Sequence, residues 1–132
     1  MKILHIIPNL TIGGAERLVV DICEEIYSTK EHEIKLITFN NSFHNFEKPP
    51  SYFTHIPSCF HPSITSKSMI KVEALQNFID NYNPDIIHSH LWETEMLLSK
   101  IEIKNAIRFT HFHDNISQLR NSILVKTKKD VT

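Results

Sequence analysis

Hydrophobic residues along the chain form short runs that predict β-strands. The first run covers residues 2–7 and ends at a proline, and segments of similar character lie at 33–39, 85–90 and 106–112. Nearly continuous apolarity over so few residues is typical of strands that are buried on both faces of a parallel sheet. A shorter segment at 52–56 indicates one more strand. The pattern therefore predicts five strands.

Between these strands, apolar residues recur at helical spacing. Residues 15–26 place apolar side chains on one side and charged ones on the other, as an amphipathic helix does. The same spacing predicts a second helix over 68–82, a third over 92–103 and a further helix after Asn115. Residues 58–68 look irregular. Strands that alternate with helices predict the α/β class, a Rossmann-like, open and mostly parallel sheet with helices on both faces.

Composition narrows the class of protein. The chain has 132 residues, enough for one domain with its own core. Its 14 basic and 15 acidic residues give a net charge of −1, which argues against a nucleic-acid partner because such proteins usually carry a basic footprint. The 2 cysteines do not make a disulfide framework. We find no signal-peptide pattern and no run near the ~20 apolar residues of a membrane span, so we expect a cytoplasmic protein.

Unusual polar residues gather after three of the predicted strands. In an open parallel sheet, ligands bind outside the carboxyl ends of the strands. The residues at these ends are Asn9, Gly13 and Gly14 after the first strand, His90, Trp92 and Glu93 after the fourth, and His111, His113 and Asp114 at the fifth. Because these strand ends share one edge of the sheet, the sequence predicts a ligand site there.

Gly13 and Gly14 are the 2 glycines of the chain, and they open the first predicted helix. A helix N-terminus favours phosphate through its unpaired N–H groups, and glycine lets a ligand come close to the backbone. The functional interpretation is a diphosphate or sugar contact, and the alternative is a simple turn into the helix. The sequence lacks both the Gly-x-Gly-x-x-Gly pattern of dinucleotide-binding proteins and the Gly-Lys-Ser/Thr of P-loop proteins. Neither a nicotinamide dehydrogenase nor a P-loop ATPase is supported.

Two His-x-His pairs, His88/His90 and His111/His113, are the second group of candidates. Residues two apart on a strand point to the same side, so each pair shares one face of the sheet. Clustered imidazoles suit zinc, but later strands offer no ligands that would complete a hydrolase site. We expect His88 and His111 in the interior. His90 and His113 lie nearer the strand ends and are better candidates for hydrogen bonds to a sugar or a phosphate.

Three segments together resemble glycosyltransferase family 4, which has the GT-B fold. They are residues 1–17 with their Gly-Gly-Ala-Glu-Arg sequence, residues 84–92 (PDIIHSHLW) and residues 108–115 (RFTHFHDN). The resemblance implies two Rossmann-like domains, of which this chain is similar to the N-terminal, acceptor-side one. It also implies transfer of a sugar from a nucleotide-sugar with retention of configuration, and without a metal or another cofactor.

The resemblance further implies roles for individual residues. Gly13 and Gly14 approach the donor diphosphate. His113 contacts the transferred sugar near the reacting centre and is the expected catalytic residue. The residues expected on the acceptor side are Asn9, Arg17, His90, Trp92, Glu93 and Asn115. No residue is assigned to a metal.

The partners implied by the resemblance are a nucleotide-sugar donor and a glycan or lipid-linked acceptor, as in surface polysaccharide synthesis. The family also has a C-terminal nucleotide-sugar-binding domain, which residues 1–132 do not include. We therefore expect a single acceptor-side domain that is incomplete and inactive alone. It would lie in the cytoplasm or, through the basic residues 126–129, at the inner face of the cell membrane. Two alternatives stay open: a stand-alone flavodoxin-like binding or regulatory module, and a fragment of a His-rich metal-dependent hydrolase.

Overall fold

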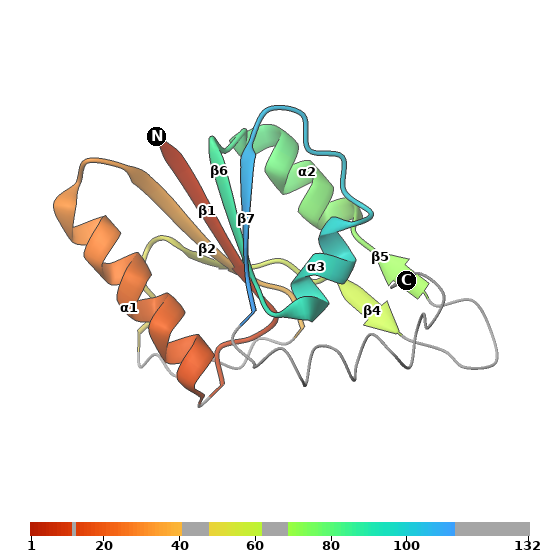
Figure 1. Cartoon of the computed structure of the whole chain (residues 1–132), viewed down its shortest axis with the longest axis horizontal. Helices are drawn as coiled ribbons and strands as arrows, with labels where there is room; N and C mark the ends of the chain where they lie inside the picture. Colours follow the sequence, from red (N-terminus) through yellow and green to blue (C-terminus); the bar gives the residue numbers. More distant parts are fainter. Residues whose placement is uncertain (12, 41–47, 62–68, 113–132) are drawn as a thin grey trace, which may run out of the picture.

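A five-stranded parallel sheet forms the centre of the molecule (Figure 1). The computed structural model describes residues 1–11, 13–40, 48–61 and 69–112. In spatial order, the strands are β3 (Phe53–His55), β2 (Glu33–Thr38), β1 (Lys2–Ile7), β6 (Ile86–His90) and β7 (Ile107–His111). All neighbouring pairs in this sheet are parallel. The predicted Rossmann-like α/β class is confirmed.

The strand order reverses between β1 and β6. The chain first moves outward from β1 through β2 to β3, and it then returns past β1 to form β6. The register pairs Lys2 with Glu33 on one side of β1 and Ile3 with Ile86 on the other. Ligands of open α/β sheets bind outside the carboxyl ends of the strands at such a switch point. The ends of β1 and β6 are therefore the place where a site is expected.

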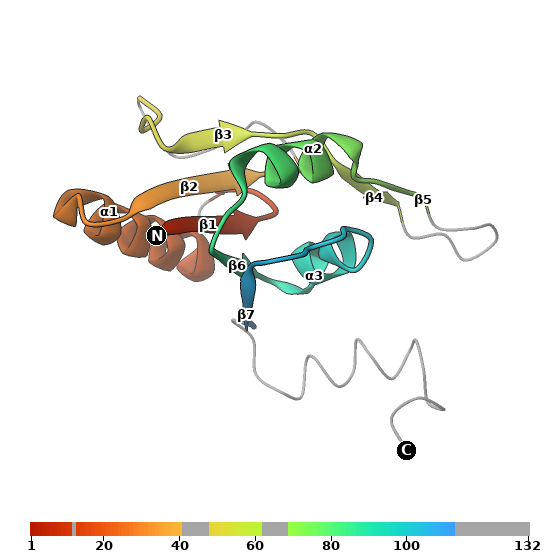
Figure 2. The ribbon, with the colours of Figure 1, turned by 90° about the horizontal axis from the view of Figure 1, so that it is seen from above.

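Helices cover both faces of the sheet, as predicted (Figures 1 and 2). Helix α1 (Gly14–Thr29) packs on one face, and helices α2 (Glu73–Tyr82) and α3 (Trp92–Leu98) pack on the other. The core under α1 includes Ile7, Val19, Cys23, Ile34 and Leu36. The core under α2 and α3 includes Leu4, Ile37, Leu75, Ile87 and Leu97. Residues of β1 alternate between these two cores because successive side chains on a strand point to opposite faces.

The second predicted helix is shorter than the apolar spacing suggested. It begins at Glu73 and not at residue 68, because the preceding residues are in a strand. That strand, β5 (Met69–Lys71), pairs in antiparallel orientation with β4 (Cys59–His61) and forms a separate two-stranded sheet. The expectation that residues 58–68 are irregular was therefore wrong for 59–61. Backbone pairing with a partner strand overrode the helical spacing of a few apolar side chains.

The third helix also ends earlier than predicted, at Leu98 and not at residue 103. The backbone N–H groups of Lys100 and Ile101 donate to the carbonyls of Leu97 and Leu98, each at 3.1 Å, so the chain leaves the helix through tight turns. Ile101 is nevertheless buried in the core. Ile101 thus fits the helical spacing because it is buried, although it lies in the loop after the helix. The helix predicted after Asn115 lies outside the described residues.

Burial explains the state of the thiol in α1. Cys23 is a free cysteine whose side chain lies wholly in the core, and burial raises the pKa of its thiol to about 12. Such a thiol is a packing residue and not a nucleophile at neutral pH. Within the part of the chain that the structure describes, no helix has the length and apolar character to cross a membrane.

Candidate functional site

The loop after β1 is held in place by its own polar groups. Asn9 Oδ1 accepts a hydrogen bond from the hydroxyl of Thr11 at 3.0 Å. The carbonyl of Pro8 accepts hydrogen bonds from the N–H groups of Phe39 and Asn40, at 3.1 and 2.8 Å, and so ties this loop to the end of β2. The structure thus places Asn9 at the carboxyl edge of the sheet, where it is half-buried and orders the loop.

Gly13 and Gly14 differ in why they are glycines. Gly13 is the N-cap of α1 with φ −170° and ψ 165°, an extended backbone that any residue adopts. A Cβ at Gly13 would collide with the carboxylate of Glu16, which folds back over it. A Cβ at Gly14 would meet nothing within 4 Å. Gly13 therefore permits a close approach by Glu16, and Gly14 borders open space.

The amino end of α1 attracts an anion, but it also carries a carboxylate that would compete with that anion. The aligned peptide dipoles make this end positive, and among the described residues no side chain caps it by a hydrogen bond. Glu16, however, brings its negative charge to the first turn. Arg17 is exposed and forms an ion pair with Asp21 at 3.7 Å. A phosphate that approaches Gly14 would compete with the Glu16 carboxylate for the helix end.

A strained turn follows β6. Leu91 has φ 70° and ψ 152°, which residues other than glycine rarely adopt and which costs on the order of 1–3 kcal/mol. The N–H of Leu91 donates to the carbonyl of His111 at 3.1 Å, and the hydroxyl of Thr94 donates to the carbonyl of His90 at 2.7 Å. These bonds hold the turn, which brings Trp92, 41% exposed, to the start of α3.

Glu93 is linked to the end of β2. Its Oε2 accepts a hydrogen bond from Asn40 Nδ2 at 2.8 Å. Asn40 directly follows Phe39, so this contact joins the carboxyl ends of two strands on either side of β1. The sequence analysis did not include Asn40 among the candidate residues. Its position just past a parallel strand was the signal that could have identified it.

Four imidazoles lie together on one face of the sheet. The ring centroids of His88 and His90 are 4.2 Å apart, and His5 lies 4.9 and 5.2 Å from them. His111 lies 5.9 Å from His88 and 5.8 Å from His90. The parallel register explains the grouping, because it pairs His5 with His88 and His90 with His111. The predicted same-face pairing of His88 with His90 is confirmed, whereas the predicted pair of His111 and His113 includes a residue outside the described part of the chain.

The burial of the imidazoles differs from the expected order. We expected His88 and His111 in the interior and His90 nearer a ligand. Instead His90 is 0% exposed, whereas His88 and His111 are only partly buried. His90 Nε2 also lies 2.9 Å from His5 Nδ1, a hydrogen bond in which one neutral ring donates and the other accepts. Proximity to a strand end did not predict exposure, because the ring of His90 packs against the rings of His5, His88 and His111.

His5 is the member of the cluster that the sequence analysis missed. It lies within the first apolar run and was assigned to a buried strand without a further role. Only the register with β6 brings it opposite His88. Burial, with a smaller contribution from the charge of His88, lowers the pKa of His5 to about 3. His5 is therefore neutral at physiological pH.

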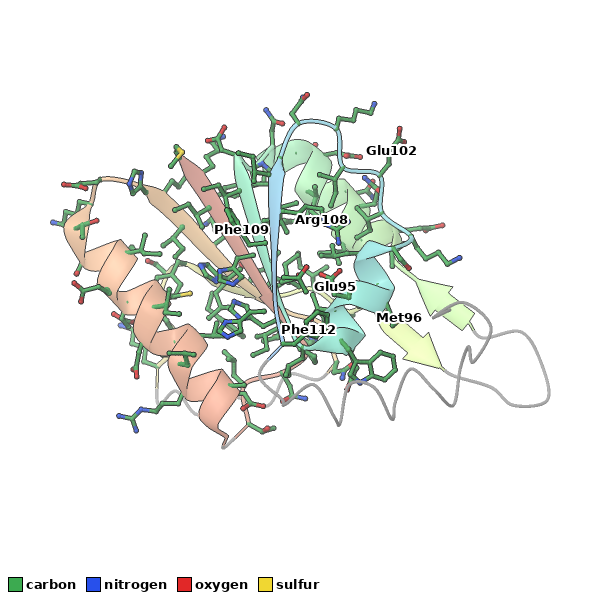
Figure 3. The ribbon with its side chains drawn as sticks, viewed as in Figure 1. Glu95, Met96, Glu102, Arg108, Phe109 and Phe112 are labelled. Carbon is green, nitrogen blue, oxygen red and sulfur yellow. The ribbon has the colours of Figure 1, made fainter. Side chains whose placement is uncertain are left out.

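The other face of β6 and β7 is joined to α3 by one carboxylate. Glu95 accepts hydrogen bonds from Ser89 Oγ, from Thr110 Oγ1 at 2.9 Å and from Arg108 Nη2 at 3.1 Å. Figure 3 shows Arg108 and Phe109 on opposite sides of β7, with Glu95 on the side of Arg108. This network fixes α3 to the two strands that carry the imidazoles.

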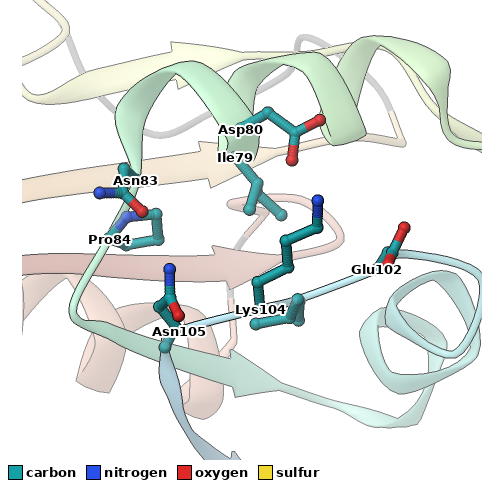
Figure 4. A pocket seen from close by; sticks show the side chains of 9 residues that line it. Ile79, Asp80, Asn83, Pro84, Glu102, Lys104 and Asn105 are labelled. Atoms are coloured by element: carbon teal, nitrogen blue, oxygen red, sulfur yellow. The ribbon is translucent and has the colours of Figure 1, made fainter.

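A cavity of about 220 Å³ lies at the opposite edge of the sheet (Figure 4). It is formed between the end of α2 and the segment that leads into β7. Its lining is Ile79, Asp80, Asn83, Pro84, Glu102, Ile103, Lys104, Asn105 and Ala106. The cavity is therefore near the amino ends of β6 and β7 and does not belong to the predicted site.

The structure brings most of the predicted residues to one edge. Asn9, Gly13 and Gly14 follow β1, and Trp92 and Glu93 follow β6. Two predicted residues, the catalytic His113 and the acceptor-side Asn115, lie outside the described part of the chain. The roles assigned to all of these residues stay predictions.

Comparison with known families identifies the domain. The model of Glycosyltransferase Family 4 matches residues 12–129 of the chain. No curated protein matches the chain. The matched region includes Gly13 and Gly14, the turn after β6 and all of β7. The parallel sheet with strand order β3-β2-β1-β6-β7 is consistent with the N-terminal Rossmann-like domain of a GT-B fold. The chain belongs to glycosyltransferase family 4.

Proposed function

We propose that this chain is the acceptor-side domain of a retaining glycosyltransferase. It would help to move a sugar from a nucleotide-sugar to a glycan or lipid-linked acceptor, in the synthesis of a surface polysaccharide. The observation that carries the proposal is that the glycine loop and the polar turn follow the carboxyl ends of two neighbouring strands, β1 and β6, at the switch point of a family 4 domain. Transfer would require a C-terminal nucleotide-sugar-binding domain, and the chain would be inactive without it.

The donor side of the proposed site is the start of α1. Gly14 has space beside its Cα, so a diphosphate oxygen can come close to the backbone there. The positive helix end would stabilise the charge that develops on the diphosphate as the glycosidic bond breaks. Glu16 would have to turn away from Gly13 when the donor binds. Donor binding would therefore compete with the contact that Glu16 makes with Gly13 in the free protein.

The catalytic residue in this proposal is His113. It follows β7 by two residues and is placed by sequence beyond His111. Its imidazole would hydrogen-bond to the transferred sugar while the bond to the diphosphate breaks. Glu95 would contribute indirectly, because it holds β7 against α3 through Thr110 and Arg108.

The acceptor side would be formed by the turn after β6 and the loop after β1. Trp92 has an exposed ring at which a sugar can stack, and Glu93 and Asn9 offer oxygen acceptors for hydroxyl groups. His90 would support this surface from beneath, while Arg17 and Asn115 would line its margins. The proposed transfer uses no metal and no other cofactor. The proposed location is the cytoplasm, at the inner face of the membrane where lipid-linked acceptors are found.

The test is a transfer assay with the chain in its complete enzyme, joined to its C-terminal domain. Replacing His113→Ala should lower kcat by about 100-fold or more, the size of effect seen when one transition-state hydrogen bond is lost. The matched control is His32→Ala, a histidine at the opposite edge of the sheet. Both variants should keep the wild-type Tm. Equal turnover in wild type and His113→Ala would remove His113 from the reaction.

A further inference from the structure

The imidazole cluster has the geometry of a metal site. His5, His88 and His90 each offer one ring nitrogen, and these three atoms all lie within 4.8 Å of one another. The separation between His5 Nδ1 and His90 Nε2 is 2.9 Å. Nitrogens bound tetrahedrally to one zinc ion at about 2.0–2.1 Å lie roughly 3.4 Å apart. The three nitrogens are therefore close to the spacing that a single ion requires, and small rotations of the rings would reach it.

The ligand atoms of the cluster, which are imidazole nitrogens, favour one class of metal ion. Imidazole nitrogen suits zinc and its transition-metal neighbours, whereas magnesium and calcium require oxygen ligands. Among the described residues, the cluster consists of imidazoles alone and includes no carboxylate. His111 is the next ring, with its centroid 5.8 Å from that of His90, and it lies at the open side of the cluster. It or a water molecule would complete a fourfold site.

The sheet holds the ligands in place before any ion binds. His5 is 2% exposed and His90 is 0% exposed, and both belong to paired strands at the centre of the sheet. His88 is stacked on His90 with an interplanar angle of 26°. Two buried histidines beside a partly buried third are unusual in a sheet, where apolar side chains pack more favourably. An ion at this point would join β1 to β6 at the switch point.

From this geometry we propose that His5, His88 and His90 bind one transition-metal ion of the zinc class, which fastens β1 to β6 beneath the carboxyl edge. This site goes beyond the proposed transfer reaction and does not depend on it. The ion is structural. It lies within the sheet, apart from the amino end of α1 where the donor diphosphate is proposed to bind, so the metal-free transfer chemistry proposed above is unchanged.

The test uses the full chain, freed of metal with a chelator and titrated with Co²⁺. The expected result is one Co²⁺ per chain with the visible absorption of a tetrahedral site, displacement by Zn²⁺ and a raised Tm. Replacing His88→Gln, at the least buried of the three ligands, should weaken Co²⁺ binding about 100-fold or more, since loss of even an outer-shell partner costs about 10–100-fold.

Two further measurements test whether Co²⁺ binds at the imidazole cluster and not elsewhere. His32→Gln is the matched control, because His32 is a histidine outside the cluster, with its Nδ1 3.4 Å from the terminal amine. It should bind Co²⁺ as the wild type does. If His88→Gln fails to fold, the ¹¹³Cd resonance of the wild-type protein should instead report a ligand set of ring nitrogens. Absence of stoichiometric binding, or equal binding by wild type and folded His88→Gln, would overturn the proposal.

Discussion

The two faces of β6 differ in how their polar side chains are accommodated. On the face under α3, Ser89 donates to Glu95, which also binds Thr110 and Arg108, so a negative charge is met by three donors. On the face toward α1, the rings of His90 and His88 lie against the ring of His5. The face under α3 stabilises a negative charge, whereas the face toward α1 disfavours a protonated imidazole.

The difference follows from what each side chain can satisfy. A carboxylate accepts several hydrogen bonds at once and is stable when charged donors surround it. A protonated imidazole carries a positive charge and two N–H donors, and burial away from solvent makes that charge costly. The imidazole face therefore depends on neutrality or on a bound cation, whereas the Glu95 face depends on ionisation. The predictions below separate these two dependences.

Acidification should cause the largest effect, and it should act through the imidazole face. The folded pKa of His5, about 3, lies below its unfolded value of 6.5. Between pH 6.5 and pH 3, His5 is therefore protonated in the unfolded chain but neutral in the folded protein. In metal-free protein, the free energy of unfolding should fall by about 1.4 kcal/mol for each pH unit between pH 6.5 and pH 3 and be independent of this group above pH 6.5.

Urea denaturation of wild type and His5→Leu from pH 7.5 to pH 5 checks this slope. His88 and His90 face His5 in both proteins, so the difference between the two slopes isolates His5. The variant should lose most of the pH dependence in this range, whatever its absolute stability. His32→Gln should retain it. Parallel curves for wild type and His5→Leu would contradict the assignment.

On the other face, removing Glu95 should have a smaller effect. Glu95→Ala leaves Ser89 and Thr110 without their shared acceptor and should lower the free energy of unfolding by about 2 kcal/mol. The control is Arg108→Gln, which should cost at most about 0.5 kcal/mol because this ion pair is 38% exposed on the arginine side and is screened by solvent. Thermal or urea unfolding at pH 7.5 measures both. Equal losses would mean that the ion pair, and not the hydroxyl groups, holds α3 to the sheet.

Much of the fold could be predicted from the sequence because buried parallel strands leave a local signal. The segments at 33–39, 85–90 and 106–112 each agree with an observed strand to within one residue at either end. Helix ends were less predictable. Ile101 has helical spacing but is buried in a loop, and the strand at 69–71 depends on pairing with the strand at 59–61. Pairing between two strands is not contained in the periodicity of either one.

The candidate site was predictable only where it depends on strand ends. The rule that ligands bind at carboxyl ends located Asn9, Gly14 and Glu93 without knowledge of the structure. It could not find His5 or Asn40, since their neighbours are set by strand register and strand order. It also favoured His90 as a ligand contact, because the packing of His90 against His5 depends on strand register and has no local signature in the sequence.

The central claim is that the start of α1 at the switch point receives the donor diphosphate. The most direct measurement is a ¹⁵N NMR titration with a nucleoside diphosphate of this chain, segmentally ¹⁵N-labelled and joined to its C-terminal nucleotide-sugar-binding domain, in which the amides of the 2 glycines appear in a sparsely populated region of the spectrum. The account predicts shifts at Gly13 and Gly14 that are lost in Gly14→Leu, a substitution at a position with open space. Shifts confined to Lys104 and Asn105, at the opposite cavity, or unchanged glycine resonances at millimolar ligand would contradict it.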